Sequence, residues 1–518
     1  MTIGGKSYMY GLINGEIIPV TGRDTRFSSM IVDEDKIIAI GGVELLKQYE
    51  LESIIDLKGK TVVPGFYDSH LHLVSTFMNE VAINFDDATS FEDVYDMIRS
   101  FPNKKDYPII FGKRLSEFSL KEKRLPTRKE LDEVVKDYPL MINSIEFHTI
   151  LVNSAAMNLL KIPFTSEGFE KDEQGLFTGR IRNRGAFIAL KKAYALLGET
   201  SHLKGADKVI NSAIRKGVTT LVTVEGGPLF HDKHPEMILK HSQDFDIDVT
   251  LFYSTTDIKK VIQLNLPRIG GDIFVDGSFR SHNAALFEPY KDSPGDLGKL
   301  FFSYSELFEF VTHAHDLELQ ISLHAVGPRA IELVLDVFED VLKNKPQKDH
   351  RYRIEHFELP LPRHIKRAKE LGVVLAMHPT YEYFFREEGM MYHTRLNDEM
   401  RKSTNPFKSI VDEGIVVAGC SDSDSMPIDP MLGIHSAVNH SNKASRVDPY
   451  EALKMFTING AYGVFEDHVK GTLETGKIAD FCILDKNPLK VDAKDLKMIK
   501  VFATYKNGKC IYKDHSYD

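Results

Sequence analysis

Residues 61–73 read TVVPGFYDSHLHL, a β-branched run followed by a Pro-Gly turn and then by His70 and His72. If a strand continues through these two positions, its side-chain period of two places both imidazoles on one face, roughly 6–7 Å apart. A strand end of this kind offers two nitrogen ligands to one metal ion.

A His-x-His pair carries little weight alone, because 20 histidines in 518 residues yield about 0.8 such pairs by chance. A second pair, His313 and His315, lies in SELFEFVTHAHDLELQ, whose apolar spacing is helical. Side chains two apart on a helix point in different directions, so we expect a solvent-exposed helix surface there. The pair at 70 and 72 differs because a buried-strand run precedes it and suitable partners lie downstream.

The composition excludes several classes of protein. A length of 518 residues predicts two or three substructures, and 42% hydrophobic with 27% charged residues is typical of a globular protein. A net charge of −10 argues against binding to nucleic acid or to anionic membranes, because both rely on clustered Lys and Arg. We therefore expect neither a nucleic-acid nor a membrane partner.

The cysteines and the N-terminus favour a cytoplasmic location. The three cysteines form no CxxC pair and no even framework, which indicates a reducing compartment. The first 20 residues lack a basic start and an apolar core, and no run of about 18 apolar residues occurs. We expect neither a signal peptide nor a membrane span.

Both ends of the chain have a sequence pattern that is typical of short strands and turns. The segment YGLINGEII carries an Asn-Gly hairpin signal, and Asn507-Gly508 repeats it near the C-terminus. These features predict one small β-sandwich-like domain built from residues 1–60 and 463–518.

The middle of the chain alternates apolar strand-like runs with helix-like stretches, which is typical of a parallel α/β fold. The strand-like runs are 61–66, 219–224, 249–253, 273–275, 320–324, 353–356, 373–377 and 415–419. This series predicts a (β/α)₈ TIM-like barrel over residues 61–75 and 201–462. A ninth run, 139–143, falls in a stretch too long for a barrel connection, so we expect residues 76–200 to form an inserted subdomain or lid.

Reactive groups in such barrels lie at the carboxyl ends of strands. The predicted strands end on four histidines and one carboxylate, namely His70, His72, His324, His356 and Asp422. Each histidine alone would more often be a hydrogen-bonded core residue. Together, at matching strand ends, they predict a metal site.

Motifs along nearly the whole chain resemble the amidohydrolase superfamily, in particular its YtcJ-like branch of metal-dependent hydrolases, amidohydrolase family 3. The matching motifs are VVPGFYDSHLHL, HTILVNSAAM, GVTTLVTVEGG, DIFVDGSFRSHNAALFEPYKD, HAVG, RIEH, GCSDSDSMPIDPMLGIHSAV and KGTLETGKIADFCILDKNP. The resemblance implies a barrel, a small β domain from both termini, and an insertion after the first barrel strand.

The resemblance also implies roles for the strand-end residues. His70 and His72 would bind the more buried metal ion, and His324 and His356 the more exposed one. Asp422 would contact metal and take the proton from the attacking water, and Asp424, two residues on, is its alternative. The cofactor would be one or two divalent ions, with zinc favoured and iron or manganese compatible.

Three departures from the family pattern concern the site. Asp272 stands where relatives commonly carry a bridging Lys, so it either ligates directly or the site holds one metal ion. Asp276, with a turn role as its alternative, and Glu225 are further replacements for that Lys. Pro328 replaces an Asp, and Asn183 replaces a Glu in a motif that also lacks the family's Trp.

Substrate-binding candidates are His148, His378 and Tyr381, and a packing role in the subdomain is the alternative for His148. Arg280 and His282 are further candidates, for which a surface loop is the favoured alternative. The resemblance implies a hydrolase that uses metal-activated water to cleave a C–N bond of the amide, N-acyl, formamide or cyclic amide type in a small-molecule substrate. Two alternatives stay open: a deaminase or esterase of the same superfamily, and a ligand-binding barrel that has lost a full metal site. A homodimer would be compatible with exposed sheet edges of the small domain.

Overall fold

The computed structural model describes residues 9–102, 107–117, 119–144, 149–162, 168–227 and 231–515. The chain divides into two compact units. One consists of Met1–His72, Ile210–Val224 and Ile238–Asp518, and the other of Leu73–Val209 and Glu225–Met237.

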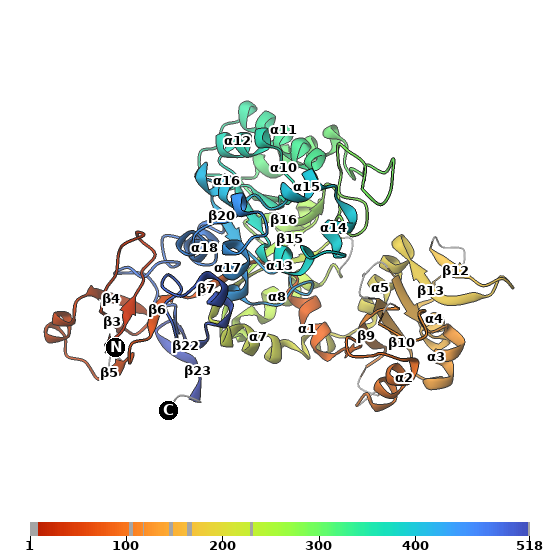
Figure 1. Cartoon of the computed structure of the whole chain (residues 1–518), viewed down its shortest axis with the longest axis horizontal. Coiled ribbons are helices and arrows are strands. Elements are labelled where there is room, and N and C mark those ends of the chain that lie inside the picture. The colour runs from red at the N-terminus through yellow and green to blue at the C-terminus, as the bar shows by residue number, and fades with distance from the viewer. Residues whose placement is uncertain are drawn as a thin grey trace. The chain divides into compact units, whose positions relative to one another are not determined.

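The first unit contains an eight-stranded barrel sheet in which consecutive strands are neighbours. The paired strands run parallel, as expected for strands that alternate with helices. The barrel strands are β7 (Phe66–Leu71), β14 (Val218–Gly226), β15 (Asp248–Ser254), β16 (Arg268–Phe274), β17 (Gln320–Ala325), β18 (Arg353–His356), β19 (Val374–Met377) and β20 (Val417–Gly419). The predicted α/β barrel is thereby confirmed (Figure 1).

Residues just after β20 connect the two ends of this sheet. The N–H of Asp422 donates to the carbonyl of His70 (2.9 Å), and the N–H of His72 donates to the carbonyl of Ser423 (2.5 Å). The carboxylate of Asp68 accepts the N–H of Ser421 (2.9 Å). These bonds hold the end of β7 against the segment that follows β20.

Helices of the first unit bury one apolar face. In α11 (Pro328–Asn344), the buried residues recur three or four positions apart, as in Ile331, Val334, Leu335 and Phe338. The other helices of this unit are α9 (Ile258–Gln263), α10 (Tyr304–Asp316), α12 (Pro362–Leu371), α13 (Pro379–Phe385), α14 (Met391–Arg395), α15 (Asp398–Lys402), α16 (Phe407–Asp412), α17 (Pro430–Val438), α18 (Pro449–Met455) and α19 (Ile458–Tyr462). Two helices span the boundary between the units, α7 (Ala206–Arg215) and α8 (His234–His241).

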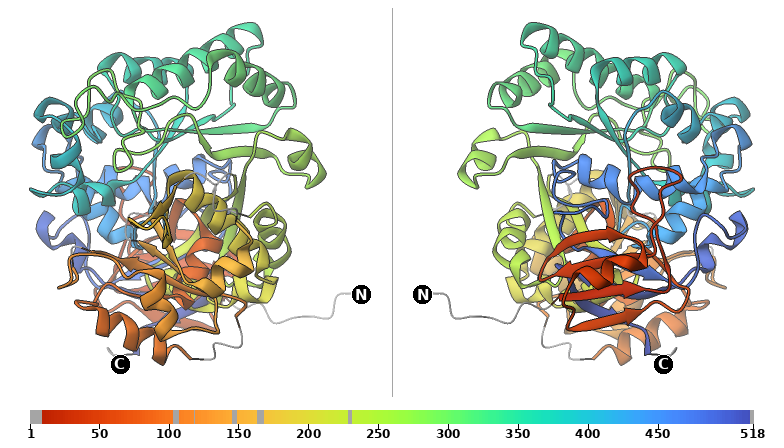
Figure 2. Two further views of the ribbon diagram at one scale, coloured as in Figure 1. Left: turned by 90° about the vertical axis from the view of Figure 1, so that its right-hand side faces the viewer. Right: turned by 90° about the vertical axis from the view of Figure 1, so that its left-hand side faces the viewer.

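Strands from both chain ends share one small β core in the same unit. One sheet has the order β4-β3-β1-β5 and the other the order β2-β6-β21-β22-β23. Their strands are β1 (Met9–Ile13), β2 (Glu16–Ile17), β3 (Ser29–Asp33), β4 (Lys36–Gly41), β5 (Ser53–Asp56), β6 (Thr61–Pro64), β21 (Phe481–Leu484), β22 (Val501–Lys506) and β23 (Lys509–Lys513). Buried side chains such as Leu12 and Phe481 belong to one cluster. Figure 2 shows the red N-terminal strands beside the blue C-terminal strands.

Two local predictions for the N-terminal region are wrong. The expected hairpin at Asn14 does not form, because β1 and β2 join different sheets. The expected first barrel strand, 61–66, is instead β6 of the small domain, and the barrel strand begins at Phe66. One apolar run thus contributes to two sheets, because the chain leaves the first sheet at Gly65. Glycine suits this position, since an added Cβ would lie 2.3 Å from the Thr219 hydroxyl oxygen.

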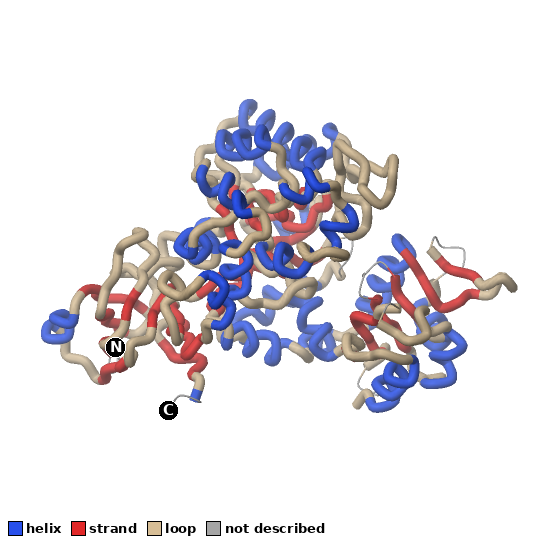
Figure 3. Tube along the Cα trace, viewed as in Figure 1, coloured by secondary structure: helices blue, strands red, loops and turns tan. Residues whose placement is uncertain are grey.

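The second unit contains a six-stranded sheet of order β12-β13-β11-β10-β9-β8. In β10, alternate residues enter different hydrophobic clusters: Leu140 and Ile142 join one, and Met141 joins the other. This alternation follows the period of two in a strand and buries both faces of the sheet under helices (Figure 3). The strands are β8 (Ile83–Asn84), β9 (Ile110–Leu115), β10 (Leu140–Ser144), β11 (Thr149–Val152), β12 (Phe169–Lys171) and β13 (Phe177–Arg182).

The helices of the second unit follow amphipathic segments. They are α1 (Leu73–Val81), α2 (Phe91–Ser100), α3 (Arg128–Val134), α4 (Ser154–Leu160), α5 (Asn183–Leu196) and α6 (Glu199–Leu203). A capping box starts α3, in which Thr127 and Glu130 exchange side-chain and backbone hydrogen bonds. None of the helices in the described ranges has the length and apolar character that crossing a bilayer requires.

Candidate metal centre

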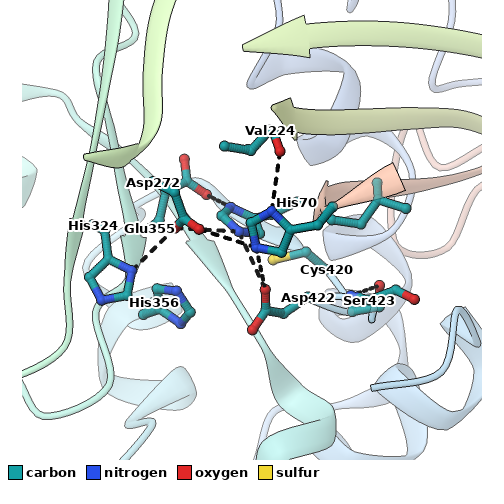
Figure 4. Close-up of polar contacts among 12 residues, drawn as sticks. His70, Val224, Asp272, His324, Glu355, His356, Cys420, Asp422 and Ser423 are labelled. Carbon is teal, nitrogen blue, oxygen red and sulfur yellow. Dashed lines mark hydrogen bonds and ion pairs between the residues drawn. The ribbon is translucent and has the colours of Figure 1, made fainter. Parts of the chain in front are cut away.

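Four histidines meet at the carboxyl ends of the barrel strands. His70 lies in β7 and His72 directly after it, whereas His324 lies in β17 and His356 ends β18. These residues are between 0 and 6% exposed. Because parallel strands end at the same edge of a barrel, residues far apart in sequence converge here (Figure 4).

Asp422 faces the two histidines of the first strand. Its Oδ1 lies 3.5 Å from Nε2 of His70 and 3.3 Å from Nε2 of His72. Nδ1 of His72 lies 3.1 Å from the carbonyl oxygen of Val224, which orients the ring so that Nε2 faces the carboxylate. Asp424, the alternative to Asp422, does not belong to any group of potential metal ligands found among the described residues.

Asp272, in β16, lies between the histidines of different strands. Its Oδ2 is 3.1 Å from Nε2 of His72, and its Oδ1 is 3.3 Å from Nδ1 of His324. The residue is 5% exposed, so both oxygens face the protein interior. One carboxylate thus connects the residues of β7 with those of β17.

Three groups of side chains in the described ranges have ligand atoms within 4.8 Å of one another. Two of these groups consist of residues that the sequence predicts as ligands. The three groups are His70, His72 and Asp422; Asp272, His324 and His356; and His70, His356 and His378.

The donor set fits a divalent metal ion. Imidazole and carboxylate ligands suit zinc and related transition metals. Among the described residues, Nε2 of His70 and Nδ1 of His356 are buried and make no hydrogen bond. Buried polar atoms are rarely left without a partner, so these nitrogens fit an ion that the protein holds in solution.

An interior network that the sequence prediction missed supports His70. Nδ1 of His70 is 2.8 Å from Oε2 of Glu355, and that carboxylate is held by Arg353 (2.8 and 3.0 Å) and by the hydroxyl of Ser322. Arg353 also donates to the carbonyl of Ser69 (2.7 Å). Because Glu355 holds Nδ1 of His70, the other ring nitrogen, Nε2, is directed at the metal centre. The motif RIEH contained the signal, since Arg353 and Glu355 are two apart on one strand face.

Two residues of the centre have left-handed backbone conformations. His356 has φ of 70° and Asp422 has φ of 58°. Residues other than Gly seldom adopt such values, and they occur often at functional sites. At His356 the strand alternation ends, and the ring approaches the His324 ring with centroids 4.3 Å apart.

Charges in the centre are strongly coupled. Burial alone would raise the pKa of Asp272 and Asp422, but the neighbouring imidazoles hold the pKa of each carboxylate well below its usual range. Burial alone would lower the pKa of His70, but the carboxylates of Asp422 and Glu355 raise it to about 9. Burial lowers the pKa of His378 to about 3. The carboxylates are therefore anionic at neutral pH and available to a cation.

Tyr381 and His378, the predicted substrate-binding residues, lie within this cluster. The Tyr381 hydroxyl donates to Oδ2 of Asp422. The His378 ring lies 4.3 Å from that of His356 and 5.2 Å from that of Tyr381, centroid to centroid. His148, the third predicted substrate-binding residue, lies outside the described residues.

The other replacements for the family Lys have different surroundings. The carboxylate of Asp276 accepts backbone N–H groups from Ala285 (2.8 Å), Val326 (2.9 Å) and Gly327 (2.8 Å), so it braces loops at the barrel mouth. Glu225 belongs to the second unit, where Oε1 accepts the N–H of Val74 (3.0 Å). These bonds are structural, as in the alternative to a ligand role for Asp276, but they reach loops beyond the turn at Gly277.

The remaining candidates have local structural partners. His282 lies 3.0 Å from Asp292, and the Arg280 guanidinium lies over the Phe385 ring. Pro328 is the first residue of α11, a position that tolerates Pro because the N–H there is free of helical bonding. His313 is exposed on α10, whereas His315 is buried and contacts Tyr352 and Lys345. Nothing is described for the Asn183 side chain.

Comparison with known proteins agrees with this architecture. The chain is 26% identical to YtcJ of Bacillus subtilis, covering 96% of this chain and 98% of that protein. It is 25% identical to N-substituted formamide deformylase of Arthrobacter pascens, covering 96% of this chain and 97% of that protein. The crystal structure of an uncharacterized metal-dependent hydrolase from Pyrococcus furiosus superimposes with a TM-score of 0.80 at 28% identity, covering 93% of this chain and 100% of that one.

The family model described as the amidohydrolase family matches residues 53–512. That match includes every barrel strand and each residue of the centre. The protein therefore belongs to the amidohydrolase family and is a metal-dependent hydrolase.

Proposed function

We propose that this hydrolase cleaves a C–N bond of the amide type in a small molecule, such as an N-acyl, formamide or cyclic amide bond. The observation that carries this proposal is that Asp272 connects two buried groups of potential ligands. Joined groups of this kind suit a pair of metal ions acting on one carbonyl.

The proposed ligands follow these groups. His70, His72 and Asp422 hold one ion, and His324 and His356 hold the other. Asp272 serves both groups and takes the place of the Lys that relatives commonly carry. Because the Asp272 carboxylate is itself negatively charged, it can act as an anionic ligand without a covalent modification of the side chain.

A divalent ion held by these residues would lower the pKa of water toward neutrality and polarise the substrate carbonyl. Asp422, anionic at neutral pH, accepts a proton as the water oxygen forms its bond to the carbonyl carbon. As the C–N bond breaks, Asp422 returns that proton to the leaving nitrogen, which gives a carboxylic acid and an amine. Tyr381 holds the carboxylate in position through Oδ2.

The relatives support the proposed bond type. The match to N-substituted formamide deformylase covers 96% of this chain. We therefore propose N-substituted formamides as the first amide substrates to be tested. The proposed metal is zinc, because imidazole and carboxylate donors at a buried site suit it, although iron and manganese accept the same donors.

The alternative function is a ligand-binding barrel that has lost a full metal site. It depends on the two departures from the family pattern at Asp272 and Pro328. Asp272 faces both ligand groups, and Pro328 is the first residue of α11. Neither departure weakens the hydrolase function. A deaminase or esterase activity is an outcome that a substrate panel separates.

The test combines metal quantification with that panel. Purified protein is analysed for bound metals and then assayed with N-substituted formamides, N-acyl amines, cyclic amides, matched esters and aminated heterocycles. We expect one or two divalent ions per chain, amide hydrolysis, loss of activity on chelation and recovery with zinc. Turnover of esters or aminated heterocycles alone would contradict the C–N amide proposal, and a chain without bound metal would contradict the site.

A further inference from the structure

His378 is the one member of the three ligand groups that the strand-end motifs did not predict as a metal ligand. It directly follows β19, at a non-helical position before α13, with φ of −112° and ψ of 78°. This position directs the residue to the same barrel edge as His70 and His356. The ring centroids lie 5.2 Å from His70 and 4.3 Å from His356.

The histidines of this group have buried ring nitrogens that make no hydrogen bond. Among the described residues, these are four atoms: Nε2 of His70, Nδ1 of His356, which lies 3.9 Å from Oε1 of Glu358, and both ring nitrogens of His378. Each of the three residues also offers one ligand atom within 4.8 Å of those of the other two. Buried nitrogens are rarely left without a partner, so this cluster suits a bound cation.

From this coincidence we propose that His378 is a metal ligand. It lies in a three-imidazole position with His70 and His356 and gives a nitrogen to an ion of one of the two proposed groups, because a single imidazole nitrogen holds only one ion. The inference rests on the proposed metal centre but goes beyond the ligand set given above. It replaces the substrate-binding role predicted for His378. A side chain that is 0% exposed is out of reach of a substrate, whereas an ion bound among the rings can contact it directly.

The position shares one residue with each of the other groups. His70 also belongs to the group with His72 and Asp422, and His356 also belongs to the group with Asp272 and His324. Glu355 already fixes the His70 ring through Nδ1, which leaves Nε2 for the ion. His378 therefore adds a neutral nitrogen donor between two groups that otherwise contain the carboxylates.

The test measures metal binding rather than turnover. The variant His378→Gln keeps a polar side chain of similar length without the imidazole. Its matched control is His315→Gln. His315, on α10, is also a buried histidine, but its ring bonds to the Tyr352 hydroxyl and the Lys345 carbonyl and belongs to none of the three ligand groups. Zinc affinity is measured by competition with a chelator, and cobalt-loaded protein is examined by visible absorption.

We expect His378→Gln to lower zinc affinity about tenfold or more, since even residues that only support a ligand cost 10–100-fold on mutation. The cobalt absorption bands should shift, because a nitrogen donor is lost. His315→Gln should keep wild-type affinity and bands. Equal affinity and identical bands for His378→Gln and wild type would overturn the inference while leaving the proposed function intact.

A second measurement covers the case in which His378→Gln does not fold. Anomalous scattering from zinc-loaded crystals of the wild-type protein locates each ion. A His378 nitrogen about 2.0–2.1 Å from zinc supports the proposal, and a His378 ring that contacts no ion overturns it. Wild-type protein that binds no divalent metal would instead contradict the proposed function, and this inference with it.

Discussion

Oδ2 of Asp272 lies 3.1 Å from Nε2 of His72, and the other oxygen of the same carboxylate faces His324. The residue thereby contacts both proposed ligand groups. Asp272→Asn should reduce bound metal by one equivalent or more, because an amide is a weak, neutral ligand. Metal content per chain, measured by mass spectrometry of the purified variant, checks this.

Asp276→Asn is the matched control for that variant. Its carboxylate accepts three backbone N–H groups, so the amide NH₂ of Asn would face donors and leave them unsatisfied. We expect a loss of about 1–3 kcal/mol in the free energy of unfolding with metal content retained. Equal metal content in both variants would contradict the bridging role of Asp272.

Asp422→Asn should abolish most turnover while the fold persists. Asn cannot accept and return the proton, so we expect kcat to fall about 10²- to 10⁴-fold. Asp424→Asn is the control, because the two residues are neighbours in sequence and only Asp422 joins a ligand group. If Asp424→Asn has the larger effect on kcat, the proton-transfer role belongs to Asp424.

Tyr381→Phe should separate positioning from metal binding. The Tyr381 hydroxyl donates to Oδ2 of Asp422, and a hydrogen bond to a charged group contributes about 1.5–3 kcal/mol. We expect kcat to fall about tenfold to 150-fold with bound metal unchanged. Steady-state kinetics and metal analysis check this, and an effect confined to KM would indicate substrate contact instead.

Substitutions at Arg353 and Glu355 should change the free energy of unfolding and the zinc affinity in different ways. Either Arg353→Met or Glu355→Gln leaves one buried partner unpaired, at a cost of about 3–5 kcal/mol. The double variant should recover much of that stability but keep zinc affinity 10–100-fold low, since His70 has lost its carboxylate. Denaturant unfolding and chelator competition measure the two quantities.

Acid should weaken the start of α3. Hydrogen bonds from Arg124 and Thr127 lower the pKa of Glu130 to about 2. A carboxylate with a lowered folded-state pKa stabilises the fold above its unfolded value and loses this effect as pH falls toward the folded value. The Tm difference between wild type and Glu130→Gln should therefore be full at pH 7 and shrink between about pH 4.5 and pH 2.

The sequence was sufficient to predict those site residues whose chemistry is visible at strand ends. His70, His324 and Asp422 could be matched to a parallel barrel because its strands all end at one edge, and the barrel prediction is confirmed. Their roles as ligands stay predictions. The motif RIEH placed Glu355 beside Arg353, but its contact with His70 was missed, because His70 is 285 positions away and the barrel register brings the two together.

Local signals failed where one segment had to serve two sheets. The run at 61–66 has the composition of a barrel strand, but its residues pair with β21 from the far end of the chain. Asn14-Gly15 has the composition of a hairpin turn, yet the chain changes sheets there. The strand propensity of a residue indicates that it favours an extended conformation. It does not indicate which other strand the residue will pair with. The domain boundaries at residues 75 and 200 stay predictions.

The shared β core has a consequence for synthesis of the protein. The hydroxyl of Tyr10 donates to the carbonyl of Gly508, 498 positions further along the chain. At 5–20 residues per second, a ribosome needs on the order of 25–100 s between these two residues. The N-terminal strands thus wait at least this long for their C-terminal partners, and the small domain closes only after residue 508 has been synthesised.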